Sequence, residues 1–156
     1  MPTVRIRSRV NSARFVATAR LTGYVLAFHK ASKDGSAKCD ALKTGRSTDE
    51  VIGVVYEIDD EDISVLDRYE GKGVGYDRVG VDVAPLDGGQ SLPVFTYCAT
   101  HIDASLRPYT WYVDHVLTGA REHTLPDDFV RAIEQTPSVE DPDRDRDARE
   151  RSIYPS

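Results

Sequence analysis

Short apolar runs alternate with polar residues along most of the chain, and turns rich in glycine, proline or aspartate separate the runs. This pattern predicts β-strands over residues 13–20, 24–30, 51–58, 76–84 and 92–100. Val51–Ile58 is the strongest of them, because a β-branched run bounded by turn residues is typical of a strand buried on both faces. Residues 31–50 are polar and predict a loop, and Leu86–Gly89 predicts a hairpin turn.

A second pattern, with apolar residues three or four positions apart, predicts helices between the strands. Ile63, Leu66 and Tyr69 place an apolar side on a short helix over 61–69. Asp59 and Asp60 offer N-caps, and Gly71 is the expected stop, since glycine takes the left-handed conformation freely. Further helices are predicted over 109–119 and 126–135, and a partly helical stretch over 143–151.

This order of elements predicts an α+β fold built on a small, mostly antiparallel sheet or barrel with inserted helices. Residues 1–136 read as one domain, and residues 137–156 as a charged C-terminal tail. The tail alternates acids and arginines, so a solvated or loosely helical segment with weak ion pairs is its default interpretation.

The composition is ordinary for a soluble globular protein, at 40% hydrophobic and 29% charged residues. No run approaches the roughly 18 apolar residues of a membrane-spanning helix, and no signal peptide is visible. We therefore predict a cytoplasmic protein without a membrane partner. The two cysteines, Cys39 and Cys98, are expected to be isolated and reduced.

Charge is divided unevenly along the chain. Residues 1–46 contain ten basic and two acidic residues, a net +8, although the whole chain carries −6. Such a segment can bind nucleic acid, or it can fold back onto the acidic remainder. The net negative charge, with no interleaving of aromatic and basic residues, favours the second interpretation and no nucleic-acid partner. A transit peptide is a weaker alternative, because the same stretch already reads as part of the fold.

Four histidines and an aromatic cluster complete the inventory of side chains with chemical potential. His29, His101, His115 and His123 show no spacing that demands catalysis or metal binding, and a structural or surface role is preferred. The cluster of Tyr109, Trp111 and Tyr112 is expected to be core or pocket wall. Cys98 lacks an identifiable base, which a cysteine nucleophile requires.

Glu70 is the candidate for acid/base chemistry. A carboxylate at a helix end, just before the glycines of 71–75, can be sheltered in a pocket where it accepts and returns a proton. The alternative is a solvated glutamate at the helix end. Negative charge at a helix C-terminus costs some tenths of a kcal/mol, so an exposed glutamate there would bring no stability.

Several short motifs, in order along residues 5–135, carry a resemblance to a known family. They are Ser12–Phe15, Leu26–Lys30, Asp34–Ser36, Gly53–Tyr56, Leu66-Asp67-x-x-Glu70-Gly71, Gly75-Tyr76, and Tyr112 followed by Gly119-Ala120-x-Glu122-His123-x-Leu125-Pro126. Each motif alone is weak. Together they resemble the gamma-glutamylcyclotransferase (AIG2-like) family.

The resemblance implies an enzyme that cyclises a gamma-glutamyl amide to 5-oxoproline and releases an amine or amino acid. It implies Glu70 as the general acid/base, Tyr76 and Tyr112 as substrate-binding residues, and no cofactor or metal. The only partner implied is the small-molecule substrate, and a homodimer is left open. The alternatives are a metabolite-binding domain of the same fold and an inactive relative.

One departure from the family concerns the start of the chain. The family begins with a strand and a Tyr-Gly-Ser-Asn loop, and Met1–Arg9 resembles the segment just after that loop. Such a loop holds the substrate's α-carboxylate with converging backbone N–H groups. We expect either that the missing strand is encoded upstream of Met1, which is preferred, or that the chain is a truncated, inactive relative.

Overall fold

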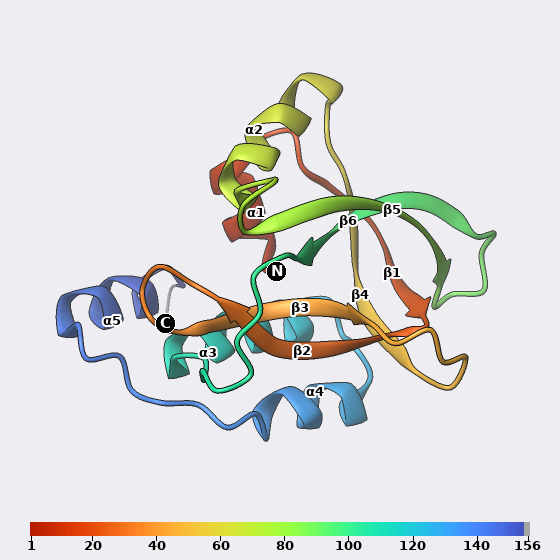
Figure 1. Ribbon diagram of the computed structural model, residues 1–156. Helices are drawn as coiled ribbons and strands as arrows, with labels where there is room; N and C mark the ends of the chain where they lie inside the picture. The colour runs from red at the N-terminus through yellow and green to blue at the C-terminus, as the bar shows by residue number, and fades with distance from the viewer. Residues whose placement is uncertain (155–156) are drawn as a thin grey trace.

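The computed structural model describes residues 1–154 as a four-stranded and a two-stranded antiparallel sheet with five helices around them (Figure 1). The elements, in chain order, are α1 (Thr3–Arg9), β1 (Arg14–Thr22), β2 (Tyr24–Ala31), β3 (Ala37–Lys43), β4 (Glu50–Glu57), α2 (Asp60–Glu70), β5 (Tyr76–Pro85), β6 (Leu92–Ala99), α3 (Thr110–Glu122), α4 (Asp127–Glu134) and α5 (Arg144–Arg151). The α+β class and the antiparallel pairing are as predicted.

The larger sheet has the strand order β4-β1-β5-β6, and β2 pairs with β3 in a separate ribbon. In the described part of the chain the strands do not close into a barrel. The two sheets meet where β3 contacts β6 and β2 contacts β4. Asp40 on β3 fixes this junction, because its carboxylate accepts from the Ala99 backbone N–H at 2.8 Å and from His29 Nε2 at 2.9 Å.

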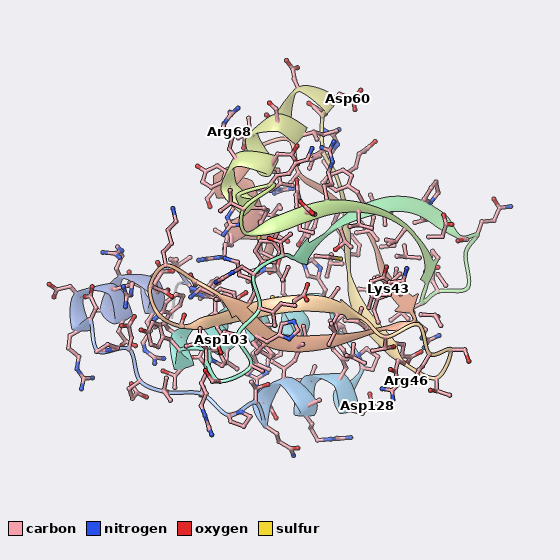
Figure 2. The ribbon with its side chains drawn as sticks, in the orientation of Figure 1. Lys43, Arg46, Asp60, Arg68, Asp103 and Asp128 are labelled. Atoms are coloured by element: carbon pink, nitrogen blue, oxygen red, sulfur yellow. The ribbon has the colours of Figure 1, made fainter. Side chains whose placement is uncertain are left out.

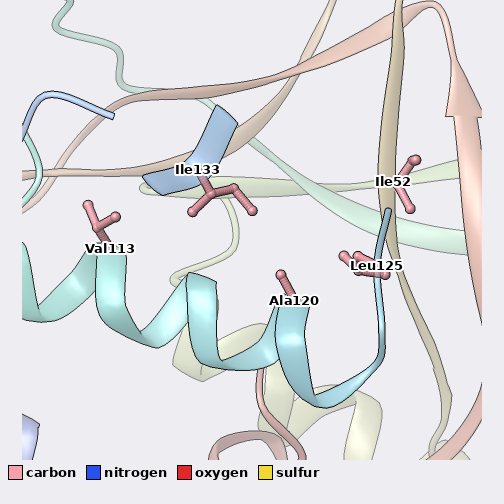
Figure 3. Close-up of a cluster of buried hydrophobic side chains, with 5 residues drawn as sticks. All are labelled: Ile52, Val113, Ala120, Leu125 and Ile133. Carbon is pink, nitrogen blue, oxygen red and sulfur yellow. The ribbon is translucent and has the colours of Figure 1, made fainter. Parts of the chain in front are cut away.

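Two hydrophobic clusters hold the helices in place. Figure 3 shows the first, in which β4, α3, the loop before α4 and α4 contribute Ile52, Val113, Ala120, Leu125 and Ile133. Full burial of a side chain such as Ile133 stabilises the fold by about 1.5–3 kcal/mol. The second cluster joins α1 to α2 through Ile6, Val10, Ala13 and Leu66. It therefore fixes the end of α2, where Glu70 lies.

Two predictions about the strands are wrong. The segment 31–50 was expected to be a loop, but it contains β3, which pairs with β2 from Tyr24↔Lys43 to Ala31↔Ala37. Strand β4 was expected to be buried on both faces, but Ile52 is its only buried residue. The physical reason is a cavity along β4, beside which its other residues are half-buried or exposed.

The charged C-terminal segment is anchored to the fold by a few side chains, although most of its residues are exposed. Asp141 is 1% exposed and accepts hydrogen bonds from Trp111 Nε1 at 2.8 Å and from Arg146 Nε at 2.6 Å. Further along, Glu150 on α5 lies 3.2 Å from Arg5 and 3.0 Å from His115. The expected helix over 143–151 is present as α5. In residues 1–154 no helix is long and apolar enough to cross a membrane.

Candidate active site

Helix α2 places Glu70 at its last position, one residue away from the predicted end. Gly71 follows with φ 64°, the left-handed conformation expected of a helix stop. The N–H groups of Val74 and Gly75 then both donate to the Gly71 carbonyl, at 2.9 and 2.8 Å. This tight turn brings Tyr76, the first residue of β5, close behind Glu70. The expected side-chain N-cap does not form, because Asp59 binds Arg14 at 2.9 Å instead.

The carboxylate of Glu70 is sheltered and paired with an arginine from α1. Its side chain is 16% exposed, and Oε1 accepts a hydrogen bond from Arg9 Nη1 at 2.7 Å. Within residues 1–154 the second oxygen, Oε2, makes no hydrogen bond. Glu70 thus keeps one oxygen free for another donor.

A cavity of about 800 Å³ opens beside Glu70. Its wall is mostly apolar and comes from β1, β4, β5, β6 and α2, with Met1, Leu66, Glu70 and Tyr97 among the lining residues. The carboxylate of Glu70 is therefore a charged group at the edge of an apolar space.

Tyr76 and Tyr112 do not line that cavity, but the structure brings them together on Cys39 of β3. The Tyr76 hydroxyl donates to the Cys39 carbonyl oxygen at 2.9 Å. The Tyr112 hydroxyl accepts from the Cys39 N–H at 3.1 Å and lies 3.0 Å from its Sγ. Both predicted substrate-binding hydroxyls are thus positioned by one residue that the sequence did not single out.

Burial keeps these three groups neutral. It raises the pKa of the Tyr76 hydroxyl, an effect to which the nearby Cys39 and the negative charge of Glu70 add. Burial also raises the pKa of Tyr112 well above its ordinary value, and that of the Cys39 thiol. At neutral pH the two tyrosines are therefore protonated, so each can donate a hydrogen bond.

A second cation, Lys30 of β2, lies against Tyr76. Its ammonium is 5.1 Å from the centroid of the Tyr76 ring, a distance that fits a cation–π contact. A side chain at Gly75 would crowd it, since a Cβ there would lie 3.3 Å from Lys30 Nζ. The glycine next to Tyr76, which the sequence pattern contained without explanation, leaves room for this lysine.

The start of the chain also reaches the site. Met1 lines the cavity, and burial lowers the pKa of its α-amino group. In Figure 1 the N-terminus lies between β6 and β3. Gly119 of α3 permits this placement, because a Cβ there would lie 2.8 Å from the Met1 carbonyl carbon.

Three of the four histidines have structural partners, and His101 is exposed. Nε2 of His123 is 2.7 Å from the Tyr56 hydroxyl, and His115 and His29 contact Glu150 and Asp40. Burial raises the pKa of the Cys98 thiol, which disfavours the reactive thiolate. Within residues 1–154 no three histidine, cysteine, aspartate or glutamate side chains are grouped closely enough to hold a metal ion.

Sequence reasoning brought Glu70, Tyr76 and Tyr112 forward but missed Arg9, Lys30 and Cys39. Arg9 was visible only as one of many basic residues near the start, and Lys30 only as the end of a motif. Cys39 lay in the segment read as a loop. No local pattern marks these three, because each acts through a partner that is at least 30 positions away.

Comparisons with known proteins agree with this architecture. A sequence model of the AIG2-like family matches residues 50–133, more than half of the chain. No curated protein sequence matches the chain. A solved structure described as a gamma-glutamyl cyclotransferase is similar at TM-score 0.84 and 23% identity, covering 97% of this chain and 92% of its own.

Two further solved structures are similar. An uncharacterised protein from Homo sapiens has a TM-score of 0.80 and 26% identity, with 88% of this chain and 83% of its own covered. YkqA from Bacillus subtilis has a TM-score of 0.69 and 24% identity, with 86% of this chain and 49% of its own covered. The likeness to the cyclotransferase, at its low identity, establishes the fold alone.

Proposed function

The chain belongs to the AIG2-like family, and from this membership and the position of Glu70 we propose that it is a gamma-glutamylcyclotransferase-like enzyme. It would convert a gamma-glutamyl amide to 5-oxoproline plus a free amine or amino acid. The observation that carries the proposal is a sheltered carboxylate at a cavity edge, with one oxygen held by Arg9 and the other free. The fold shared with a gamma-glutamyl cyclotransferase supports it.

Glu70 acts as the general base and then as the general acid. The α-ammonium of the substrate donates to Oε2 and gives up a proton to it, which leaves a neutral amine. The amine attacks the γ-carbonyl carbon, and ring geometry favours closure of the five-membered ring. The attack leaves the ring nitrogen positively charged with two protons. As the bond from the γ-carbonyl carbon to the leaving nitrogen breaks, Glu70 returns its proton to the leaving nitrogen, which departs as a neutral amine. Glu70 then takes the second proton from the ring nitrogen and the released amine receives it, so the products are 5-oxoproline, with a neutral ring amide, and an ammonium.

Tyr76 and Tyr112 orient the substrate. Tyr76 is the better donor to the oxyanion that develops on the γ-carbonyl. Its hydroxyl has to give up only its hydrogen bond to the Cys39 carbonyl in order to donate to the oxyanion. A well-placed donor of this kind contributes about 3 kcal/mol to transition-state stabilisation. Tyr112 accepts a hydrogen bond from the Cys39 N–H, and this contact helps to fix the position of the Cys39 carbonyl.

A metabolite-binding domain of the same fold is the second candidate. It is favoured by one observation: Arg9 already holds one oxygen of Glu70, and Cys39 already binds the hydroxyls of Tyr76 and Tyr112. In a binding protein these contacts would persist with the ligand bound, whereas catalysis requires the free oxygen of Glu70 to receive a proton.

Two measurements on the 156-residue protein separate these functions. Chromatography of 5-oxoproline released from gamma-glutamyl-alanine tests the enzyme, and isothermal titration with the same compound tests binding. We expect both product and a binding heat. A binding heat without product supports the binding domain. The absence of both the product and the binding heat would contradict both functions.

A further inference from the structure

Lys30 is a charged residue beside the candidate site that the proposed reaction leaves without a role. It is half-buried near the end of β2, with its ammonium 5.1 Å from the centre of the Tyr76 ring. Within residues 1–154 no carboxylate is close enough to form an ion pair with it. A lysine that gives up part of its hydration without an anionic partner has the capacity to bind an anion from solution.

The loop after α2 holds Lys30 in this place. A Cβ on Gly75 would lie 3.3 Å from both the Glu70 carbonyl oxygen and Lys30 Nζ, a tight contact that would push the ammonium away by a few tenths of an ångström. The loop is itself fixed, since the Gly75 carbonyl accepts from the Thr100 N–H at 3.2 Å. The lysine is therefore seated between the loop that ends α2 and the ring of Tyr76.

Arg9 is the other cation at the site, and it contacts Glu70 rather than Tyr76. It uses Nη1 for Glu70 Oε1, and within residues 1–154 its Nε and Nη2 groups make no hydrogen bond. In the proposed complex the α-ammonium binds Glu70. The α-carboxylate, which is attached to the same carbon atom, then falls within reach of Arg9.

The rest of the substrate extends from Glu70 towards Tyr76. In the proposed complex the γ-carbonyl meets the Tyr76 hydroxyl, and the leaving amine is then close to Lys30, whose ammonium lies 5.1 Å from the centroid of the Tyr76 ring. Arg9 accounts for the carboxylate of the glutamyl group. Lys30 therefore suits a second carboxylate, carried by the leaving group.

We propose that Lys30 is a specificity-determining residue that binds the carboxylate of the leaving amine. The substrate class is then a gamma-glutamyl amino acid rather than a gamma-glutamylamine. This inference rests on the proposed function, because it uses the substrate orientation which that function sets.

The test compares gamma-glutamyl-alanine with gamma-glutamylethylamide, which lacks only the second carboxylate. We expect wild-type kcat/KM to be about 10-fold higher for gamma-glutamyl-alanine, the effect of one charge-assisted hydrogen bond. Lys30→Met should remove this preference by lowering kcat/KM for gamma-glutamyl-alanine alone, and Lys30→Arg should retain it. Lys43→Met is the matched control, since Lys43 is an exposed lysine at the end of β3 (Figure 2).

Equal use of both compounds by the wild-type protein, or an unchanged preference in Lys30→Met, would overturn the assignment. Isothermal titration of the Glu70→Gln protein, with and without Lys30→Met, measures the same ratio in affinity without turnover. A Lys30-dependent affinity ratio together with no product from wild type refutes the catalytic proposal and supports the role of Lys30. No binding of either compound overturns the role of Lys30.

Discussion

At the scale of single residues, the site consists of polar groups that are held by neighbours distant in sequence. Arg9 and Glu70 are 61 positions apart, and Tyr112 and Cys39 are 73 apart. Glu70 and Tyr76 could be predicted from the sequence because a local signal, a helix end followed by glycines, accompanies them. Their partners Arg9 and Cys39 could not be predicted, because their contacts with Glu70 and Tyr76 arise only when α1 and β3 pack onto the site.

Removal of Arg9 leaves the sheltered carboxylate of Glu70 without its charged partner. We expect Arg9→Met to lower the free energy of unfolding at pH 7 by about 1–2 kcal/mol, measured by urea denaturation. Both side chains are under a quarter exposed, at 22% and 16%, so solvent screens the pair only in part.

The control for Arg9→Met is Arg68→Met. Arg68 is an exposed arginine two positions before Glu70 (Figure 2), and its loss removes the same charge without a buried contact. Equal stability losses in the two variants would show that the contact between Arg9 and Glu70 contributes nothing to the fold.

At the scale of elements, the sequence predicted helices and strands correctly where a local signal marks them, such as a helix stop or a β-branched run. It failed where a segment becomes a strand only by pairing with another strand. Helix α2 ends as expected because Gly71 is left-handed. Strand β3 was missed because Ala37–Lys43 has no β-branched residue, and it is a strand only through its pairing with β2. Helix α3 continues past residue 119 because Gly119 serves close packing against Met1 rather than a stop.

The segment that contains α5 illustrates how a charged stretch can be anchored by one buried residue, although no residue of the helix itself is buried. Asp141, just before it, is fully buried and forms a two-point contact with Arg146, at 2.6 Å for each hydrogen bond. The hydrogen bonds from Arg146, with a further one from Trp111, hold the pKa of Asp141 well below its ordinary value. The sequence predicted a helix with ion pairs here but did not single out Asp141, because residue composition does not reveal one buried partner.

Asp141→Asn should therefore cost about 3 kcal/mol of unfolding free energy at pH 7, because it leaves Arg146 without its carboxylate. The folded-state pKa of Asp141 lies below the unfolded value of about 3.9, so its contribution is complete above that pH and lost as the pH falls further. The difference between wild type and Asp141→Asn should shrink below about pH 4 in urea denaturation. A difference that stays constant down to pH 2.5, which we take as roughly the lower limit of such a titration, would contradict this account.

At the scale of the whole molecule, the basic start of the chain folds against acidic partners. Arg5, Arg9 and Arg20 lie 3.2, 2.7 and 2.6 Å from Glu150, Glu70 and Glu50. The cavity of about 800 Å³ extends along four strands, and β4 and β6 are the edges of the larger sheet. The buried amino group of Met1 lies at this cavity too, so the start of the chain forms part of its wall.

The central claim is that one carboxyl group, Glu70, moves a proton twice in a single turnover. Proton NMR of gamma-glutamyl-alanine mixed with the protein follows this directly, since the ring protons of 5-oxoproline are distinct from those of the open chain. We predict that wild type and Glu61→Gln, which alters a glutamate in the first turn of α2, form product at similar rates. Glu70→Gln should be slower by at least about 100-fold while it still binds the substrate. Product formation by Glu70→Gln at the wild-type rate would contradict the account.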